Sequence, residues 1–170
     1  IRKQLLTAEK ADASKKLGLD SRPVILSFGG SLGAKKINDA VMELIKNTAK
    51  DDKYQHIHGY GQYDKNFIKN LQDQGVDLNK HKNLDIREYI SNMATCLAAA
   101  DLVICRAGAI TLSEITAQGK ASILIPSPNV AENHQYHNAM ELVNKGAASI
   151  IEEKDLTGVL LIRTVQKMLD

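Results

Sequence analysis

The chain of 170 residues is 44% hydrophobic and 25% charged, a composition typical of a globular protein. Its 22 Lys and Arg residues nearly balance 20 Asp and Glu residues, and only 4% of all residues are aromatic. These values exclude the basic, base-stacking surface of a nucleic-acid-binding protein. No apolar run approaches the roughly 18 residues of a membrane span. Since the chain opens on a charged segment without Met, we expect a piece of a longer protein, folded as a single domain over residues 1–170.

Six short apolar runs, rich in β-branched residues, alternate with stretches of helical periodicity. The runs predict strands at residues 24–28, 54–59, 84–87, 102–105, 121–125 and 148–151. We expect helices at residues 8–17, 37–48, 64–74, 92–100, 111–118, 134–145 and 156–169, with Ser91 as an N-cap and Gly146 as a stop signal. The alternation predicts an α/β fold, a Rossmann-like, doubly wound parallel sheet of six strands in the order 3-2-1-4-5-6.

Two glycine-containing turns each follow a predicted strand and open a predicted helix. They are Gly29-Gly30-Ser31-Leu32-Gly33-Ala34 and Arg106-Ala107-Gly108-Ala109-Ile110-Thr111. The start of a helix offers unpaired N–H groups and a positive dipole end to an anion. Because strands 1 and 4 are neighbours where the winding reverses, both turns should flank the ligand crevice of this fold and form a diphosphate pocket. The alternative for the first turn is a tight strand-to-helix connection that binds nothing.

Side chains in and after these turns suggest further contacts. Ser31 adds a hydroxyl suited to a phosphate oxygen, and Thr111 either caps its helix or donates to a ligand. Glu114, expected on the first helical turn, is placed to accept hydrogen bonds from ribose hydroxyls, and complementing the helix dipole is the alternative. Arg106 is either a ligand contact or a structural ion-pair partner.

Polar groups after the fifth strand and four histidines complete the candidates. A proline-bounded loop ends in Asn133-His134-Gln135, whose amide and imidazole groups can bind a sugar or cap a helix. His134 and His137 lie three apart, but no third ligand has matching spacing, so we expect no metal site. His56 and His58 share one face of a strand, which favours a structural role. No residue stands out as a general base, and we expect no catalytic residue in this chain.

The motifs at the strand ends follow one another in a fixed order. Residues 29–34 and Asn38 fit the pattern GGSxGA…N, and they are followed by residues 105–114, Ile123-Leu124-Ile125-Pro126, Asn133-His134-Gln135 with Asn138-Ala139, and Gly146-Ala147-Ala148. Together, from about residue 23 to residue 151, these segments resemble the MurG family of bacterial UDP-N-acetylglucosamine (UDP-GlcNAc) transferases. The resemblance covers only the C-terminal, donor-binding half of that family's two-domain GT-B fold.

The resemblance implies roles for the residues that match the family's motifs. Ser31 should contact the donor diphosphate, the backbone of Ile90 should pair with the uracil edge, and Gln135 should bind the GlcNAc hydroxyls. Phosphate and ribose contacts are implied for Ala109, Ile110, Thr111, Leu112, Ser113 and Glu114, with Glu114 on the ribose hydroxyls. Secondary candidates are Gly30, Arg106, Gly108 and His134. The sequence departs from the family at Ala107, where serine is frequent, and at His134, where glutamine is frequent.

The function implied is that of a donor-binding domain in an inverting, metal-independent hexosyltransferase. The full enzyme would move GlcNAc from UDP-GlcNAc to lipid I, forming lipid II for peptidoglycan synthesis, at the cytoplasmic face of the bacterial inner membrane. An N-terminal domain outside this chain would supply the base, the lipid acceptor site and the peripheral membrane contact, so the isolated chain should be inactive. We expect no cofactor and no nucleic-acid partner. The alternatives are a non-catalytic nucleotide-sensing or scaffold domain and half of an NAD-dependent oxidoreductase, which the absence of GxGxxG disfavours.

Overall fold

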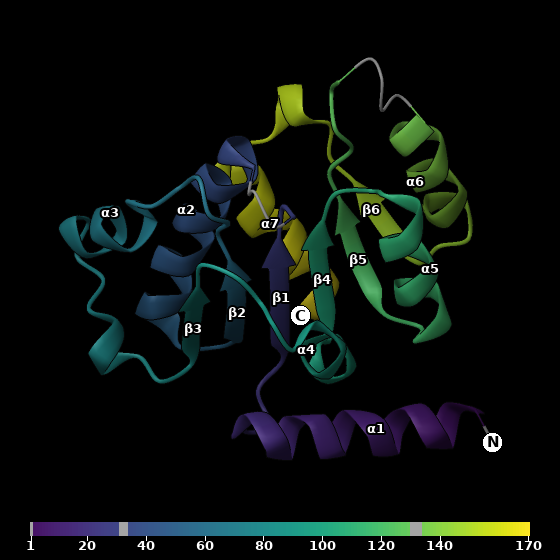
Figure 1. Ribbon diagram of the computed structural model, residues 1–170, viewed down its shortest axis with the longest axis horizontal. Coiled ribbons are helices and arrows are strands. Elements are labelled where there is room, and N and C mark those ends of the chain that lie inside the picture. The colour runs from purple at the N-terminus through teal and green to yellow at the C-terminus, as the bar shows by residue number, and fades with distance from the viewer. Residues whose placement is uncertain (1, 31–33, 130–133) are drawn as a thin grey trace.

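The computed structural model describes residues 2–30, 34–129 and 134–170. In this part of the chain, a sheet of six parallel strands has the order β3-β2-β1-β4-β5-β6, as predicted (Figure 1). The strands are β1 (Val24–Phe28), β2 (Gln55–Gly59), β3 (Leu84–Arg87), β4 (Leu102–Cys105), β5 (Ala121–Leu124) and β6 (Ala148–Ile150). Ile25 of β1 pairs with His56 on one side and with Leu102 on the other. The winding therefore reverses between β1 and β4.

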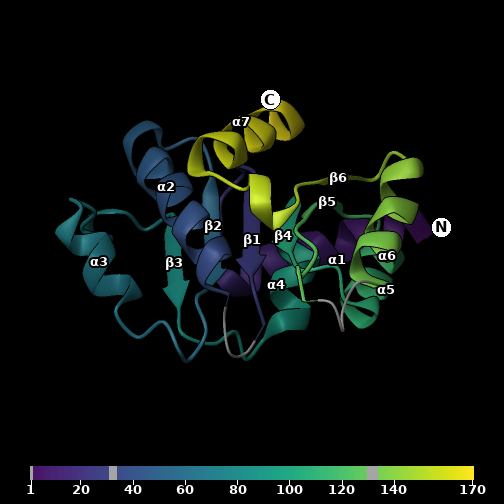
Figure 2. The same cartoon turned by 90° about the horizontal axis from the view of Figure 1, so that it is seen from above.

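Helices cover both faces of the sheet (Figure 2). The described helices are α1 (Arg2–Leu17), α2 (Lys35–Asp51), α3 (Phe67–Asp73), α4 (Met93–Ala99), α5 (Ala109–Ala117), α6 (His134–Asn144) and α7 (Gly158–Leu169). Apolar residues of α2, α3 and α7 share one core cluster with one face of the strands, and residues of α4, α5 and α6 share a second cluster with the other face. Successive strand residues such as Ile25 and Leu26 alternate between the two clusters, which explains the continuous apolar runs in the sequence.

Several predicted helix boundaries are wrong by a few residues. Helix α1 begins at Arg2 rather than residue 8; it buries only Ala13 fully, so its first turns carry no apolar period. Helix α5 begins at Ala109 rather than residue 111, because Gly108 occupies the N-cap position in an extended conformation. Ser91 is not an N-cap, since Asn92 holds that position without a side-chain cap bond. Helix α6, by contrast, ends at Asn144, one residue before its predicted end, and Gly146 follows at φ +73°, as expected of a stop signal.

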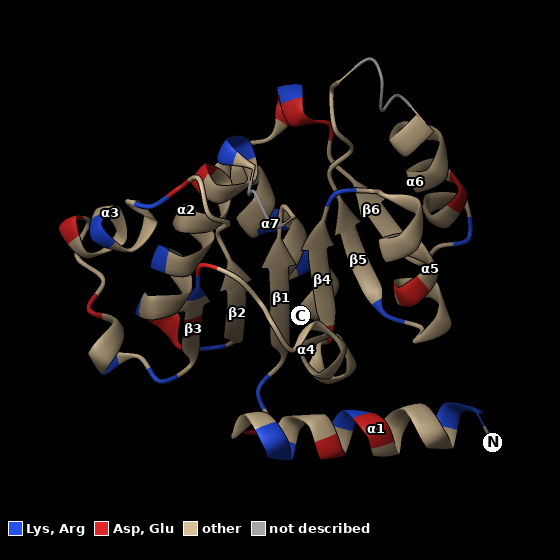
Figure 3. Ribbon diagram, in the orientation of Figure 1, with Lys and Arg blue, Asp and Glu red and all other residues tan. Residues whose placement is uncertain are grey.

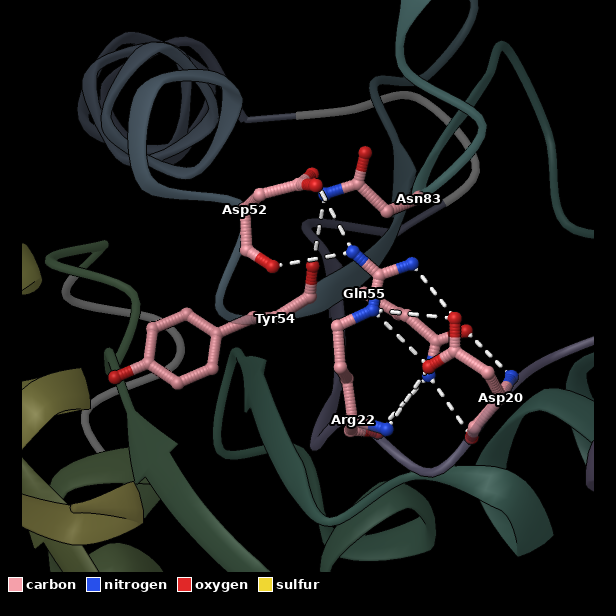
Figure 4. A network of polar contacts seen from close by, with 6 residues as sticks. All are labelled: Asp20, Arg22, Asp52, Tyr54, Gln55 and Asn83. Carbon is pink, nitrogen blue, oxygen red and sulfur yellow. Dashed lines mark hydrogen bonds and ion pairs between the residues drawn. The ribbon is translucent and has the colours of Figure 1, made fainter.

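A polar network at the amino-terminal edge of the sheet fixes the segment between α1 and β1 (Figure 4). The Gln55 side chain accepts from the Asp20 N–H at 2.8 Å and donates to the Arg22 carbonyl at 2.9 Å. Arg22 donates to both carboxylate oxygens of Asp20, and these hydrogen bonds lower the pKa of Asp20 to about 2. Asn83 donates to the Tyr54 carbonyl at 2.9 Å. Side chains of the strand ends thus satisfy backbone groups that the ladder leaves unpaired.

Two fully buried histidines, His56 and His58, lie on β2, between β3 and β1. Nε2 of His56 lies 2.6 Å from the Ser27 hydroxyl, and Nδ1 of His58 lies 2.7 Å from the same oxygen. Burial lowers the pKa of both imidazoles, that of His58 to about 3. Both rings are therefore neutral at physiological pH, in agreement with the expected structural role.

These histidines should make the fold sensitive to acid. In the unfolded chain each imidazole has a pKa near 6.5, so below that pH the unfolded state binds more protons than the folded state and gains stability. We expect the contribution of the two histidines to the free energy of unfolding to be constant above pH 7 and to fall between pH 6.5 and 3, with His58 alone costing about 2 kcal/mol between pH 8 and pH 5. Urea titrations at several pH values measure this. A flat profile would contradict the neutral burial of the two histidines.

Helices α2 and α7 approach each other closely at Gly158. A Cβ atom on Gly158 would lie 2.5 Å from the Cβ of Glu43 and 2.6 Å from its Cγ. Because the Glu43 Cβ is fixed by the α2 backbone, a methyl group there would force the two helices apart.

Replacing Gly158 by Ala should therefore destabilise the protein by about 1–3 kcal/mol, although Gly-to-Ala within a helix ordinarily stabilises by up to about 1 kcal/mol. The sign of the change separates the two effects. Urea unfolding measures it, and Val159→Ala, at an exposed position on the same turn, should change stability by less than about 0.5 kcal/mol. A Gly158→Ala protein more stable than the unaltered chain would show that the helices separate without cost.

Candidate functional site

The predicted ligand turns lie together at the carboxyl edge of the sheet. Strands β1, β4 and β5 are parallel neighbours, so the segments that follow them leave the sheet at the same edge, the upper one in Figure 1. Helix α1 lies along the opposite edge. This arrangement places the two helices α2 and α5 with their amino ends on the crevice side.

The first turn is shaped by two glycines. A Cβ on Gly29 would lie 2.7 Å from the Cβ of Ala34, so this turn closes only with glycine at that position. Gly30 has φ +105°, a conformation that other residues rarely adopt. Ala34 occupies the N-cap of α2 and makes no side-chain cap bond. Ser31, expected to contact the diphosphate, lies outside the described residues.

Helix α5 also begins without a side-chain cap. Gly108 has no side chain to offer, and the first intrahelical bond runs from the Leu112 N–H to the Gly108 carbonyl at 3.0 Å. The N–H groups of residues 109–111 therefore have no acceptor within the helix. Two uncapped helix starts at one sheet edge form an environment that favours an anion. On the first turn of α2, Lys35 is paired with Asp39, and the neighbouring exposed Lys36 adds positive charge (Figure 3).

The predicted contact residues of α5 differ in exposure. Ala109, Ile110, Ser113 and Glu114 are exposed, whereas Leu112 is packed in the core, so only its backbone can reach a ligand. Glu114 is the sixth residue of α5 rather than part of its first turn, because the helix starts earlier than predicted. The helix dipole acts mainly within the first turn. Glu114 lies beyond that turn, which disfavours the interpretation that it complements the helix dipole.

A cavity of about 250 Å³ opens beside the first turn. Its walls come from the ends of β1 and β2 and from the segment between β3 and α4, and it is lined by Phe28, Gly30, Gly59, Glu88, Tyr89, Ile90 and Met93. Ile90 is 4% exposed, and a Cβ on Gly59 would lie 3.1 Å from its side chain. This mainly apolar hollow has the dimensions and lining for a flat ring.

Of the residues that line this cavity, Ile90 and Gly30 were candidates from the sequence, and Phe28, Gly59 and Met93 were not. Only Gly59 carries a signal that could have been used. A glycine at the end of a buried strand often marks a close approach of backbone or ligand.

Arg106 forms a structural ion pair, which was one of the two interpretations of this residue. Its Nη1 lies 2.6 Å from Oε2 of Glu153 and donates to the Pro126 carbonyl at 3.2 Å. The guanidinium thus joins the end of β4 to the segment after β5 and to the turn after β6.

Gln135 and His134 open helix α6 on the same side of the molecule. Gln135 is 9% exposed, and its Oε1 accepts from the Ser127 N–H at 2.8 Å. His134 is exposed. Asn133 lies outside the described residues.

The described residues contain neither a metal-binding cluster nor a membrane-spanning helix. No group of three or more His, Cys, Asp and Glu side chains there could hold a metal ion. No helix in residues 2–30, 34–129 and 134–170 combines the length and the apolar character needed to cross a membrane.

Comparison with known proteins identifies relatives of the chain. UDP-N-acetylglucosamine--N-acetylmuramyl-(pentapeptide) pyrophosphoryl-undecaprenol N-acetylglucosamine transferase of Desulforamulus reducens is 44% identical over 99% of this chain and 46% of its own length. The transferase of the same name from Thermoanaerobacter sp. is 46% identical over 100% of this chain and 46% of its own length. The chain thus spans slightly less than half the length of these curated relatives.

Solved structures agree with the sequence relatives. The crystal structure of Acinetobacter baumannii MurG superposes with a TM-score of 0.73 at 30% identity, covering 95% of this chain and 44% of that chain. The C-terminal CMP-Kdo binding domain of A. baumannii WaaA shares the fold, with a TM-score of 0.60 at 12% identity over 98% of this chain and 88% of that one.

A family model supplies the classification. The model described as "Glycosyltransferase family 28 C-terminal domain" matches residues 24–170, from the start of β1 to the end of the chain. It includes both glycine turns, the cavity and the start of α6. The chain therefore belongs to the glycosyltransferase family 28 C-terminal domain family.

Proposed function

We propose that residues 1–170 form a single donor-binding domain of a hexosyltransferase that uses UDP-GlcNAc. The observation that carries the proposal is the juxtaposition of two uncapped helix starts with an apolar cavity at one sheet edge. A nucleoside diphosphate has the matching chemistry, a flat base next to two negatively charged phosphates. The names of the relatives supply the donor sugar and the acceptor.

In this proposal the donor lies across the edge of the sheet. The uracil enters the cavity and pairs with the backbone of Ile90, and the diphosphate lies between the starts of α2 and α5, near Ser31 and Ala109. Glu114 accepts from the ribose hydroxyls. The GlcNAc extends toward Gln135 and His134. Arg106 holds the backbone at Pro126, after β5, in place.

The reaction would be a direct displacement at the anomeric carbon. The C4 hydroxyl of MurNAc in lipid I attacks this carbon while its bond to the UDP oxygen breaks, and the configuration inverts. Backbone N–H groups at the helix starts stabilise the charge that develops on the leaving diphosphate, which makes a metal unnecessary. The base that takes the hydroxyl proton must lie on the opposite side of the sugar from UDP. We place it in the domain outside this chain, so the chain alone would bind donor without transferring sugar.

Other features of the whole enzyme belong to the same proposal. The lipid acceptor and the peripheral membrane contact would be handled by that other domain. The enzyme would work in the bacterial cytoplasm, at the cytoplasmic face of the inner membrane, and would serve peptidoglycan synthesis.

Ligand-dependent melting tests the proposed donor. We expect UDP and UDP-GlcNAc to raise the melting temperature of this chain, and NAD and ATP to leave it nearly unchanged, because ligand binding stabilises only the folded state. Isothermal titration with UDP should give the same affinity in EDTA as in Mg²⁺. A preference for NAD or ATP would refute the assignment, and binding that strictly requires Mg²⁺ or Mn²⁺ would refute the metal-independent arrangement.

Glu114 offers a sharper test of the placement of the ribose. Glu114→Ala should weaken UDP binding by about 1–3 kcal/mol, because the ribose hydroxyls lose a charged acceptor. Since Glu114 is exposed, the melting temperature without ligand should hardly change. The control is Glu9→Ala, which removes an equal charge from the exposed surface of α1 at the opposite edge. Equal affinities of the two variants would remove Glu114 from the site.

A further inference from the structure

Asn38 is a fully buried polar residue one turn into α2, and none of the contacts proposed above uses it. We propose that Asn38 is a positioning residue of the donor site, which fixes the start of α2 relative to the wall of the cavity. The inference rests on the proposed function, because it concerns the two parts of the site assigned to diphosphate and base.

The Asn38 amide joins three elements. Its Nδ2 donates to the Tyr60 carbonyl at 2.8 Å and to the Asp64 carboxylate at 3.0 Å. Its Oδ1 lies 3.0 Å from Nε2 of His58. One side chain of α2 thus holds both the end of β2 and the segment that follows it.

The Tyr60 carbonyl fixes the orientation of this amide, and the amide in turn fixes the tautomers of the buried histidines. A carbonyl oxygen only accepts, so the NH₂ group of Asn38 must face Tyr60, and its Oδ1 must face His58. Nε2 of His58 therefore carries the proton, and Nδ1, which lies 2.7 Å from the Ser27 hydroxyl and 3.1 Å from the Ser27 carbonyl, accepts from the hydroxyl. The Ser27 oxygen then accepts from Nε2 of His56. This assignment leaves Nδ1 of His56 as an acceptor, and that atom is buried without a partner among the described residues.

The same segment forms the wall of the cavity. The Tyr60 N–H donates to the Arg87 carbonyl at 2.9 Å, and the Gly61 N–H donates to the Glu88 carbonyl at 2.8 Å. These bonds extend the pairing of β2 with β3 into the segment that lines the cavity. Gly59 directly faces the Ile90 side chain. A displacement of Tyr60 would therefore shift the cavity wall.

The hydrogen bonds of Asn38 and Tyr60 connect the start of α2 with the segment after β3, and UDP would contact both of these places. The diphosphate would contact the start of α2, and the base would contact the segment after β3. A rigid site binds both groups at once only if their separation is fixed to within a fraction of an ångström. Asn38 is fully buried, so it acts through the backbone that it holds and not by touching the ligand.

Titration of this chain with UDP, with variants matched for stability, tests the proposal. Asn38→Ala should weaken UDP binding by about tenfold, the effect of losing one well-placed hydrogen-bonding group. The control, Val165→Ala, shortens a fully buried side chain of α7 and should lower the melting temperature without changing UDP affinity. If both variants bind UDP as the unaltered chain does, Asn38 is merely structural and the proposal fails.

A milder variant covers the case in which Asn38→Ala does not fold. Asp64→Asn keeps the shape of a half-buried residue but removes the charged acceptor, and we expect UDP binding to weaken by about twofold to fivefold. An unchanged affinity in this variant would overturn the proposal. If the unaltered chain fails to bind UDP, the proposed function itself is refuted, and the inference falls with it.

Two spectroscopic measurements locate the effect. Amide hydrogen exchange at Tyr60 and Gly61 should become faster in Asn38→Ala, while amides in the middle of β4 keep their protection. The nitrogen chemical shifts of His58 in the unaltered chain should report the Nε2–H tautomer. The Nδ1–H tautomer, or unchanged exchange at both amides, would contradict the network on which the proposal depends.

Discussion

The parallel pairing of β1 with β4 is the constraint on which the rest of the structure depends. It places two strands that are distant in the sequence side by side, and it reverses the direction in which the chain winds. Because both strands leave the sheet at the same edge, the helices that follow them begin there as well. Among the described residues, neither N-cap residue, Ala34 or Gly108, makes a side-chain cap bond. The topology alone therefore collects unpaired N–H groups at one point, before any particular side chain is considered.

A site built from backbone groups explains the composition of the chain near this edge. Glycine at Gly29 lets the turn after β1 close against Ala34, because a Cβ there would lie 2.7 Å from the Ala34 Cβ. Charged side chains nearby serve other purposes: Arg106 is paired with Glu153, and Lys35 is paired with Asp39. Such a site provides binding and charge stabilisation more readily than proton transfer, which suits a domain whose partner domain would complete the chemistry.

The strands could be predicted, because buried parallel strands have continuous apolar sequences. Their order and the common edge of the turns followed from the alternation of strands and helices. The roles of single polar residues could not. Whether Arg106 contacts a ligand or an ion-pair partner depends on Glu153, which reaches it only through the tertiary fold. The sequence indicated Asn38 only as part of a motif. Its partner Tyr60 follows β2, 22 residues further along the chain, and comes close to Asn38 only in the folded protein. Helix starts without a side-chain cap, as at Gly108, leave no local signal of their first residue.

The hydrogen bond between Gln135 and Ser127 has a consequence for the thermodynamics of sugar recognition. The side-chain carbonyl of Gln135 already holds the backbone after β5 against the start of α6. If they were free, the Gln135 side chain and the backbone at Ser127 would lose conformational entropy when a ligand binds. Here that entropy has already been lost during folding. A sugar reaching this side of the site would therefore meet a surface with fixed shape, and the heat released by its hydroxyl contacts would be offset less by ordering of the protein.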